Sequence, residues 1–180
     1  MDADETYPLE LLERFDVFEG LEPSDLERVY DAVNRRCYPP GESLIVEGES
    51  SRALFAVLKG RVEVLKEDES GDHKRLAVID AGTVFGEHGF VLSEPRTATV
   101  RAVDEVDTLH LHGEAFDRLA AAGGQAARTI ERNILRMLAD RQQTINERLL
   151  ELHRASDGET GYHCDKTNDI GDQLMRRWTV

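Results

Sequence analysis

The most informative stretch of the chain is residues 85–98, which read FGEHGFVLSEPRTA. Between two strand-like runs it holds one carboxylate, Glu87, and one guanidinium, Arg96, around a short glycine-containing segment. A glycine in a turn lets backbone N–H groups point at an anion, and arginine offers a planar pair of donors to phosphate oxygens. A carboxylate accepts hydrogen bonds from a sugar hydroxyl. These residue types together indicate a small site for a sugar phosphate.

The stretch resembles the phosphate-binding cassette of cyclic nucleotide-binding domains, whose pattern is close to F-G-E-x-A-L followed by P-R-x-A. Further motifs extend the resemblance over about residues 18–152: FEGL at 18–21, PGE at 40–42, VEGE at 46–49 and LKGRVEV at 58–64. Two positions depart from the pattern, because His88 replaces an aliphatic residue and Gly89 replaces alanine. Neither change removes a phosphate-binding group, since position 89 would contribute its backbone N–H.

The resemblance implies cAMP or cGMP as a reversible ligand, with cAMP slightly favoured, and no metal. Arg96 would pair with the cyclic phosphate, Glu87 would accept from the ribose 2′-hydroxyl, and Thr97 would not by itself select the base. The ligand-binding set that follows is Val64, Leu76, Ala77, Phe85, Gly86, Glu87, His88, Gly89, Pro95, Arg96, Thr97, Arg141 and Ile145.

The hydrophobic period changes along the chain from helical to strand-like and back, which predicts an α+β fold. We expect an antiparallel β-roll, a jelly-roll-like barrel, flanked by helices and followed by a long C-terminal helix. The expected divisions are N-terminal helices at 1–34, a nucleotide-binding β-roll at 35–124, a long helix at 125–154 and a tail at 155–180.

Individual elements follow from local signals. A helix is expected over residues 9–15, and a second helix capped by Ser24 with Glu27. His110 and His112 alternate with leucines, which predicts a strand with one solvated face. Strands are expected at 43–46, 53–58, 62–65, 76–79, 98–102 and 108–111.

The long helix carries a heptad-like seam. Its members, Leu135, Leu138, Gln142, Ile145, Leu149 and Leu152, alternate at spacings of three and four. A helix of this length spans roughly 45 Å, more than one β-roll can cover. The seam therefore favours a homodimer through residues 125–154 over packing on the chain's own roll. Ile130, Ile134 and Met137 lie off the seam and are expected to face the roll.

Composition excludes several functions. The formal charge of −14, from 22 basic and 36 acidic residues, disfavours nucleic acid and anionic membranes as partners. Two cysteines do not make a disulfide framework, and the acidic N-terminus is not a signal peptide. No apolar run is long enough to span a membrane, which favours a cytoplasmic protein. No catalytic constellation stands out, so the chain is not expected to be an enzyme.

The chain is thus interpreted as a cyclic nucleotide sensor that acts on an unknown effector protein through a conformational change. Residues 153–180 are too few for a helix-turn-helix, so no attached DNA-binding domain is expected. Ile170, Leu174 and Trp178 could form one face of a docking peptide. The alternative is an assembly or scaffold protein that uses the same β-roll for protein docking, with nucleotide incidental.

Overall fold

A computed structural model describes residues 9–68 and 70–159 of the chain, which forms two compact units, 1–138 and 139–180. The expected docking peptide at Ile170, Leu174 and Trp178 lies outside the described residues. The helical elements are η1 (Leu9–Arg14), η2 (Asp16–Phe18), α1 (Pro23–Ala32), α2 (Glu87–Leu92), α3 (Gly113–Ala121) and α4 (Gln125–Glu159). The strands are β1 (Val33–Tyr38), β2 (Ser43–Ile45), β3 (Ala53–Lys59), β4 (Arg61–Glu67), β5 (His73–Asp80), β6 (Val84–Phe85), β7 (Thr99–Ala102) and β8 (Val106–His112).

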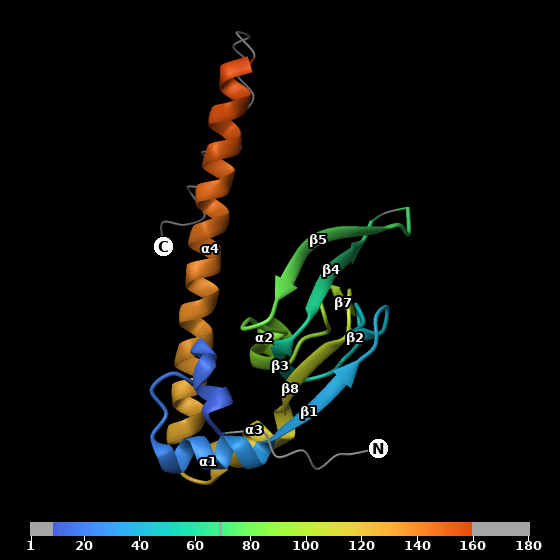
Figure 1. The fold of residues 1–180 in the computed structure, drawn as a ribbon. Coiled ribbons are helices and arrows are strands. Elements are labelled where there is room, and N and C mark those ends of the chain that lie inside the picture. The colour runs from blue at the N-terminus through green and yellow to red at the C-terminus, as the bar shows by residue number, and fades with distance from the viewer. Residues whose placement is uncertain (1–8, 69, 160–180) are drawn as a thin grey trace. The chain divides into compact units, whose positions relative to one another are not determined.

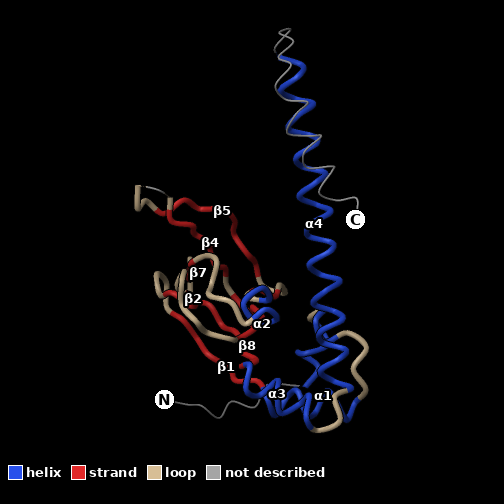
Figure 2. The backbone as a smooth tube through the Cα atoms, turned by 180° about the vertical axis from the view of Figure 1, so that it is seen from behind, coloured by secondary structure: helices blue, strands red, loops and turns tan. Residues whose placement is uncertain are grey.

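The eight strands of the first unit form two four-stranded antiparallel sheets (Figures 1 and 2). One sheet has the order β1-β8-β3-β6 and the other has the order β2-β7-β4-β5. The strand order follows the crossings of a jelly roll, in which consecutive strands alternate between the sheets, except that β4 and β5 form a hairpin within one sheet. The predicted β-roll with flanking helices and a long C-terminal helix is confirmed, although the strands form two sheets rather than a closed barrel.

The first sheet separates two hydrophobic cores. Alternate residues of β3 point to opposite faces, as in any strand: Leu54 and Ala56 join the helix-side core, whereas Phe55 and Val57 join the core between the sheets, here called the roll interior. The helix-side core also contains residues of η1, η2, α1, α3 and α4. The roll interior is completed by residues of the second sheet. Both faces of β3 and β8 are therefore buried.

This layering corrects the expectation that His110 and His112 share a solvated face. His112 is exposed, but His110 is only 4% exposed and lies in the roll interior against Tyr38 and Phe55. Leu109 and Leu111 occupy the opposite face of β8, in the helix-side core. The alternation of polar and apolar residues indicated water on one face, but a central strand between two covering layers has no wet face.

The N-terminal segment differs locally from expectation. Residues 9–14 form a 3-10 helix rather than an α-helix, and a second short 3-10 turn follows at residues 16–18. Helix α1 begins at Pro23, with Glu22 as the N-cap residue, so Ser24 is not the cap. Proline suits the first helical position because its missing N–H has no acceptor there, and this signal outweighed the capping box.

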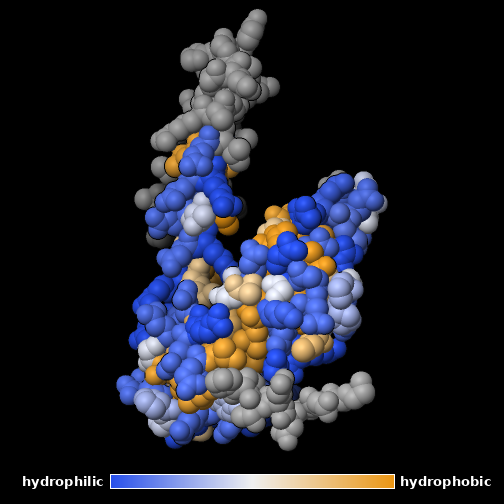
Figure 3. Space-filling view, viewed as in Figure 1, coloured by the Kyte–Doolittle hydropathy of each residue, from blue (hydrophilic) through white to orange (hydrophobic). Residues whose placement is uncertain are grey.

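Strand prediction located six of the strands and missed two; the predicted ranges were too short for β3, β4, β5 and β8 and one residue too long for β2 and β7. Strand β1, at residues 33–38, was missed because its polar run, with four exposed residues, shows no period-2 apolar pattern. Strand β6 has only two residues, too few for any period. Strand β5 runs from residue 73 to residue 80, and hydrophobic residues gather on the surface over the β4–β5 ribbon (Figure 3).

Helix α4 contributes to both units. In the first unit, Ile130 and Ile134 are fully buried in the helix-side core and Met137 packs against that core, as expected. In the second unit, the helix runs to Glu159, beyond the expected end at residue 154. No helix in the described part of the chain is long and apolar enough to cross a membrane.

Candidate functional site

Residues 85–98 hold a short helix that the sequence did not reveal. Strand β6 leads through Gly86 into α2, and Ser93 ends that helix in the left-handed conformation with φ 56°. A glycine-bearing turn was expected here, because a helix of six residues is too short for a readable period. Glu87, His88 and Gly89 therefore lie on α2, whereas Pro95, Arg96 and Thr97 lie in the segment between α2 and β7.

Glycine is required at position 86 for two reasons. Its φ is +83°, a conformation that residues with a side chain rarely adopt. A Cβ atom there would also lie 3.1 Å from the carbonyl oxygen of Ala53 and 3.2 Å from Nη1 of Arg96. The absence of a side chain at Gly86 thus allows the arginine to approach the start of α2.

The guanidinium of Arg96 is the centre of the site. Its side chain is 4% exposed and donates three hydrogen bonds to surrounding oxygens. Nε donates to Oγ of Ser51 at 2.9 Å, Nη1 to the carbonyl of Gly86 at 2.9 Å, and Nη2 to the carbonyl of Ala53 at 2.8 Å. These bonds hold the planar group between the start of β3 and the start of α2.

Two carboxylates balance the charge of this buried arginine. Burial lowers the pKa of the Arg96 guanidinium from its ordinary value, whereas the negative charges of Glu49 and Glu87 act in the opposite direction. Glu87 is 8% exposed, so neither it nor Arg96 is a residue of an ordinary surface ion pair. The two residues that the sequence singled out are therefore both buried in one site.

Gly89, which departs from the family pattern, lies directly against Arg96. A Cβ atom at this position would be 3.2 Å from Nη1 of Arg96 and 3.2 Å from the carbonyl oxygen of Glu94. His88, the other departure, is exposed, with Nε2 4.0 Å from Oε2 of Glu94. The missing methyl group at residue 89 gives the arginine side chain room.

The remaining predicted residues of the first unit fall into three groups. Phe85 is buried in the roll interior and stacks on Phe55, with ring centroids 5.0 Å apart. Pro95 and Thr97 are exposed next to Arg96, and the carbonyl of Thr97 accepts a 2.8 Å hydrogen bond from Nζ of Lys66. Val64, Leu76 and Ala77 form the third group, on β4 and β5.

A β-bulge interrupts the pairing of β4 with β5 at this third group. Val64 pairs with Ala77, whereas Leu65 pairs with Arg75, so Leu76 is the extra residue between the two pairs. Val64 packs against the roll interior, but the side chain of Leu76 is 64% exposed. The resemblance put Val64, Leu76 and Ala77 together in the ligand-binding set, but the bulge gives Leu76 an environment different from that of Val64.

Arg141 and Ile145 belong to the second unit, so their predicted approach to the ligand stays a prediction. Sequence reasoning also missed the oxygens of Ser51, Ala53 and Gly86 that hold Arg96. Two of these are backbone carbonyls, which every residue type carries, so no sequence signal could have identified them.

His110 forms a polar cluster inside the roll. Its Nε2 lies 2.8 Å from Oγ1 of Thr108, which donates its own hydrogen to the carbonyl of Arg36 at 3.0 Å. In the His110 tautomer with a proton on Nε2, the ring therefore donates to Oγ1 of Thr108 while the Thr108 hydroxyl donates to Arg36. Burial, chiefly, with the nearby His112 and Arg36, lowers the pKa of His110 to about 4.

The pKa of His110 predicts a specific acid sensitivity. Unfolded chains bind a proton at this residue near the ordinary value of 6.5, but the folded chain does so only near 4. The free energy of unfolding should thus be highest above pH 6.5 and fall, as the pH drops to about 4, by on the order of 3 kcal/mol. When measured with urea, the free energy of unfolding should fall less between pH 7 and pH 4.5 in His110→Phe than in the unmodified chain. Equal losses in both proteins would contradict this prediction.

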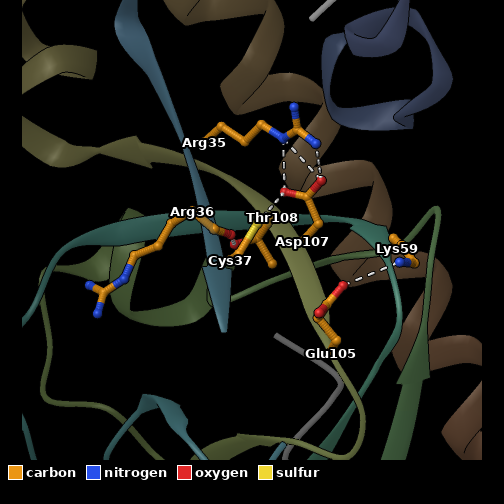
Figure 4. Close-up of polar contacts among 7 residues, drawn as sticks. All are labelled: Arg35, Arg36, Cys37, Lys59, Glu105, Asp107 and Thr108. Carbon is orange, nitrogen blue, oxygen red and sulfur yellow. Dashed lines mark hydrogen bonds and ion pairs between the residues drawn. The ribbon is translucent and has the colours of Figure 1, made fainter. Parts of the chain in front are cut away.

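A second polar cluster, formed by Arg35, Cys37 and Asp107, joins β1 to β8 (Figure 4). Arg35 donates to both carboxylate oxygens of Asp107, with its shortest bond 2.6 Å from Nη2 to Oδ2. Sγ of Cys37 lies 3.7 Å from Oδ1 of the same carboxylate. Burial and the adjacent Asp107 charge raise the pKa of the Cys37 thiol. The raised pKa disfavours the nucleophilic thiolate form of Cys37. The Arg35–Asp107 ion pair connects β1 to β8, so we interpret the cluster as structural and not as a reactive site.

Comparison with known proteins gives matches across this region. Residues 35–122 match the family model of the cyclic nucleotide-binding domain. The chain is 30% identical over 122 residues to a cAMP-dependent protein kinase regulatory subunit from Blastocladiella emersonii, covering 68% of this chain and 30% of that protein. It is 26% identical over 143 residues to a CRP-like cAMP-activated global transcriptional regulator from Mycobacterium tuberculosis, covering 79% and 62%. The chain spans less than two thirds of the length of either relative.

Solved structures share the fold. A cyclic nucleotide-binding domain from Methylobacillus flagellatus has a TM-score of 0.70 at 22% identity, covering 79% of this chain and 80% of that one. The catabolite activator protein of Thermus thermophilus has a TM-score of 0.65 at 26% identity, covering 77% and 63%.

Proposed function

Because residues 35–122 form a cyclic nucleotide-binding domain, we propose that this chain binds a cyclic nucleotide reversibly and acts as a regulatory protein. The observation that carries the proposal is the burial of Arg96 and Glu87 in one site at the start of α2, where Arg96 donates to the carbonyl of Gly86. One small ligand bound there would meet both a cation and a hydroxyl acceptor. The two relatives described above are named for cAMP, which supports proposing cAMP ahead of cGMP as the ligand.

The chemistry of the site suits a cyclic phosphate on a ribose. The bonds to Gly86 and Ala53 use one N–H on each terminal nitrogen of Arg96, so a second N–H on each nitrogen can meet phosphate oxygens. Glu87 accepts from the ribose 2′-hydroxyl, and Gly86 and Gly89 allow the ligand to approach the backbone of α2. Val64, Leu76 and Ala77 supply apolar contact to the base.

Calorimetric titration of the full chain tests this function. Separate titrations with cAMP, cGMP and a cyclic dinucleotide should give saturable binding of a mononucleotide, with cAMP bound at least as tightly as cGMP. Preference for the dinucleotide would assign another ligand to the site. Failure of all three to bind would contradict the proposal and favour a docking role for the roll.

The output of the sensor would be a change at the start of α4. Gly123 and Gly124 join α3 to α4 with φ values of +123° and +69°, so this linker uses conformations that other residues rarely adopt. A ligand can shift an equilibrium only through a difference in affinity between two states. We infer that nucleotide bound at Arg96 changes the equilibrium of this linker and so presents α4 differently to an effector protein.

The apolar residues of α4 beyond the first unit support a homodimer. Ile145 and Leu149, two members of the heptad-like seam, are exposed in this part of the helix. Heptad-like apolar positions of this kind associate in pairs. Sedimentation of Ile145→Glu should show loss of a concentration-dependent dimer, whereas Gln143→Glu on the same helix should leave it intact. A monomeric unmodified chain, or a dimer that tolerates Ile145→Glu, would contradict this expectation.

A further inference from the structure

The side chain of Arg52 contacts two helices that flank the candidate site. Nε donates to the carbonyl oxygen of Phe90 on α2 at 2.9 Å. Nη1 donates to both carboxylate oxygens of Asp117 on α3, at 2.7 and 2.8 Å. One planar group thus holds the C-terminal half of α2 and the middle of α3 at the same time.

Packing fixes the position of this arginine. Its guanidinium carbon lies 5.4 Å from the ring centroid of Phe90 and 5.9 Å from that of Phe116, and the two rings meet edge to face at 5.0 Å. A Cβ atom on Gly113 would lie 2.6 Å from Cδ of Arg52, so the absence of that atom makes room for the arginine stem. The backbone N–H of Gly113 also donates to the carbonyl of Arg52 at 2.7 Å.

The neighbours of Arg52 in the chain hold the arginine of the nucleotide site. Ser51 accepts from Nε of Arg96 through its hydroxyl, and Ala53 accepts from Nη2 through its carbonyl. Three consecutive residues therefore contact the phosphate-binding arginine, α2 and α3. Any shift of the Arg96 guanidinium toward a ligand changes the bonds on both sides of Arg52.

We propose that Arg52 is a positioning residue that couples α2 to α3, so that occupancy of the site at Arg96 is transmitted through α3 to the linker at Gly123 and Gly124. The ligand-dependent half of this proposal rests on the proposed function. The link itself is a property of the protein without ligand.

Charge alone does not make this link. The carboxylate of Asp117 is 61% exposed, and exposed ion pairs contribute little. The link depends on a planar fork that reaches Phe90 and Asp117 together, with an aromatic contact beside it. Lysine at position 52 could keep the ion pair but could not donate to both partners in this geometry.

Hydrogen exchange without nucleotide tests the link. In Arg52→Gln, the amides of residues 90–92 on α2 should exchange about 2- to 10-fold faster, the range expected for losing one hydrogen bond. Arg52→Lys should not restore the rate, and Gly113→Ala should raise it without removing a charge. The control is Arg36→Gln, which removes another exposed ion pair, with Glu42, outside α2 and α3. Unchanged α2 exchange in Arg52→Gln would overturn the link.

The same measurement with saturating cAMP tests transmission. In the unmodified chain, cAMP should slow exchange in both α2 and α3. In Arg52→Gln, cAMP should still bind and slow α2, because Arg96 and Glu87 are unchanged, but it should no longer slow α3. Equal slowing of α3 in both proteins would overturn transmission through Arg52. If cAMP fails to bind the unmodified chain, the proposed function fails, and the ligand-free comparison alone then decides whether Arg52 joins α2 to α3.

Discussion

Replacing Arg96 with alanine is expected to weaken cyclic nucleotide binding by at least about tenfold. Removing one partner of a buried charged pair typically costs about 2–5 kcal/mol, because the other charge is left without its counterpart. Arg96 is well suited to show such an effect, since its side chain is buried and held by three oxygens. Calorimetry with cAMP on the variant and the unmodified chain measures the change.

Two further variants make this result interpretable. Arg96→Lys keeps the charge but loses the planar fork, so it should bind more weakly than arginine and more tightly than alanine. Arg101→Ala is the matched control, because Arg101 lies on β7 close to Arg96 in the chain but pairs with Glu63 at 2.7 Å, away from the site. Circular dichroism should confirm that each variant is folded. Unchanged cAMP affinity in a folded Arg96→Ala protein would refute the assignment of this residue to the phosphate.

Replacing Ile134 with alanine should lower the free energy of unfolding by about 2–5 kcal/mol, the usual range for truncating a buried isoleucine. Ile134 is fully buried in the helix-side core, where it holds the first turns of α4 to the first unit. Urea denaturation followed by circular dichroism measures the loss.

The same helix offers a matched control for Ile134. Ile145 is 64% exposed, so Ile145→Ala should change stability by no more than about 0.5 kcal/mol when measured at a concentration where the chain is monomeric. Equal destabilisation by the two substitutions would show that both isoleucines are buried in solution. That outcome would contradict the division of α4 into a packed part and an exposed part.

Side-chain period predicted part of this arrangement of α4. Ile130 and Ile134 lie off the heptad-like seam and are buried, whereas Leu135 and Ile145 lie on it and are exposed. Leu138 also lies on the seam, but it packs against the helix-side core, because it follows Ile134 by four residues and so shares its helix face. The end of the helix was less predictable, and it runs to Glu159 because no strong stop signal falls before Gly158.

Burial in the sheets was harder to predict than burial in the helices. Alternation along β8 indicated a wet face at His110, yet the second sheet covers that face. Period 2 shows that two faces differ in polarity but not what lies over each of them. The position of Leu76 shows the same limit, since a bulge is decided by how β4 and β5 pair.

By itself, the sequence indicated the family resemblance, six of the eight strands, most of the helices, and the two charged residues of the candidate site. These features depend on local spacing and residue type, which are present in the chain before it folds. Only the tertiary structure decided that Ser51, Gly86 and Ala53 hold Arg96, and that Arg52 connects α2 with α3. These contacts join residues distant in the chain, often through backbone carbonyls that carry no residue-specific signal, so they exist only once the two sheets and the helices have packed together.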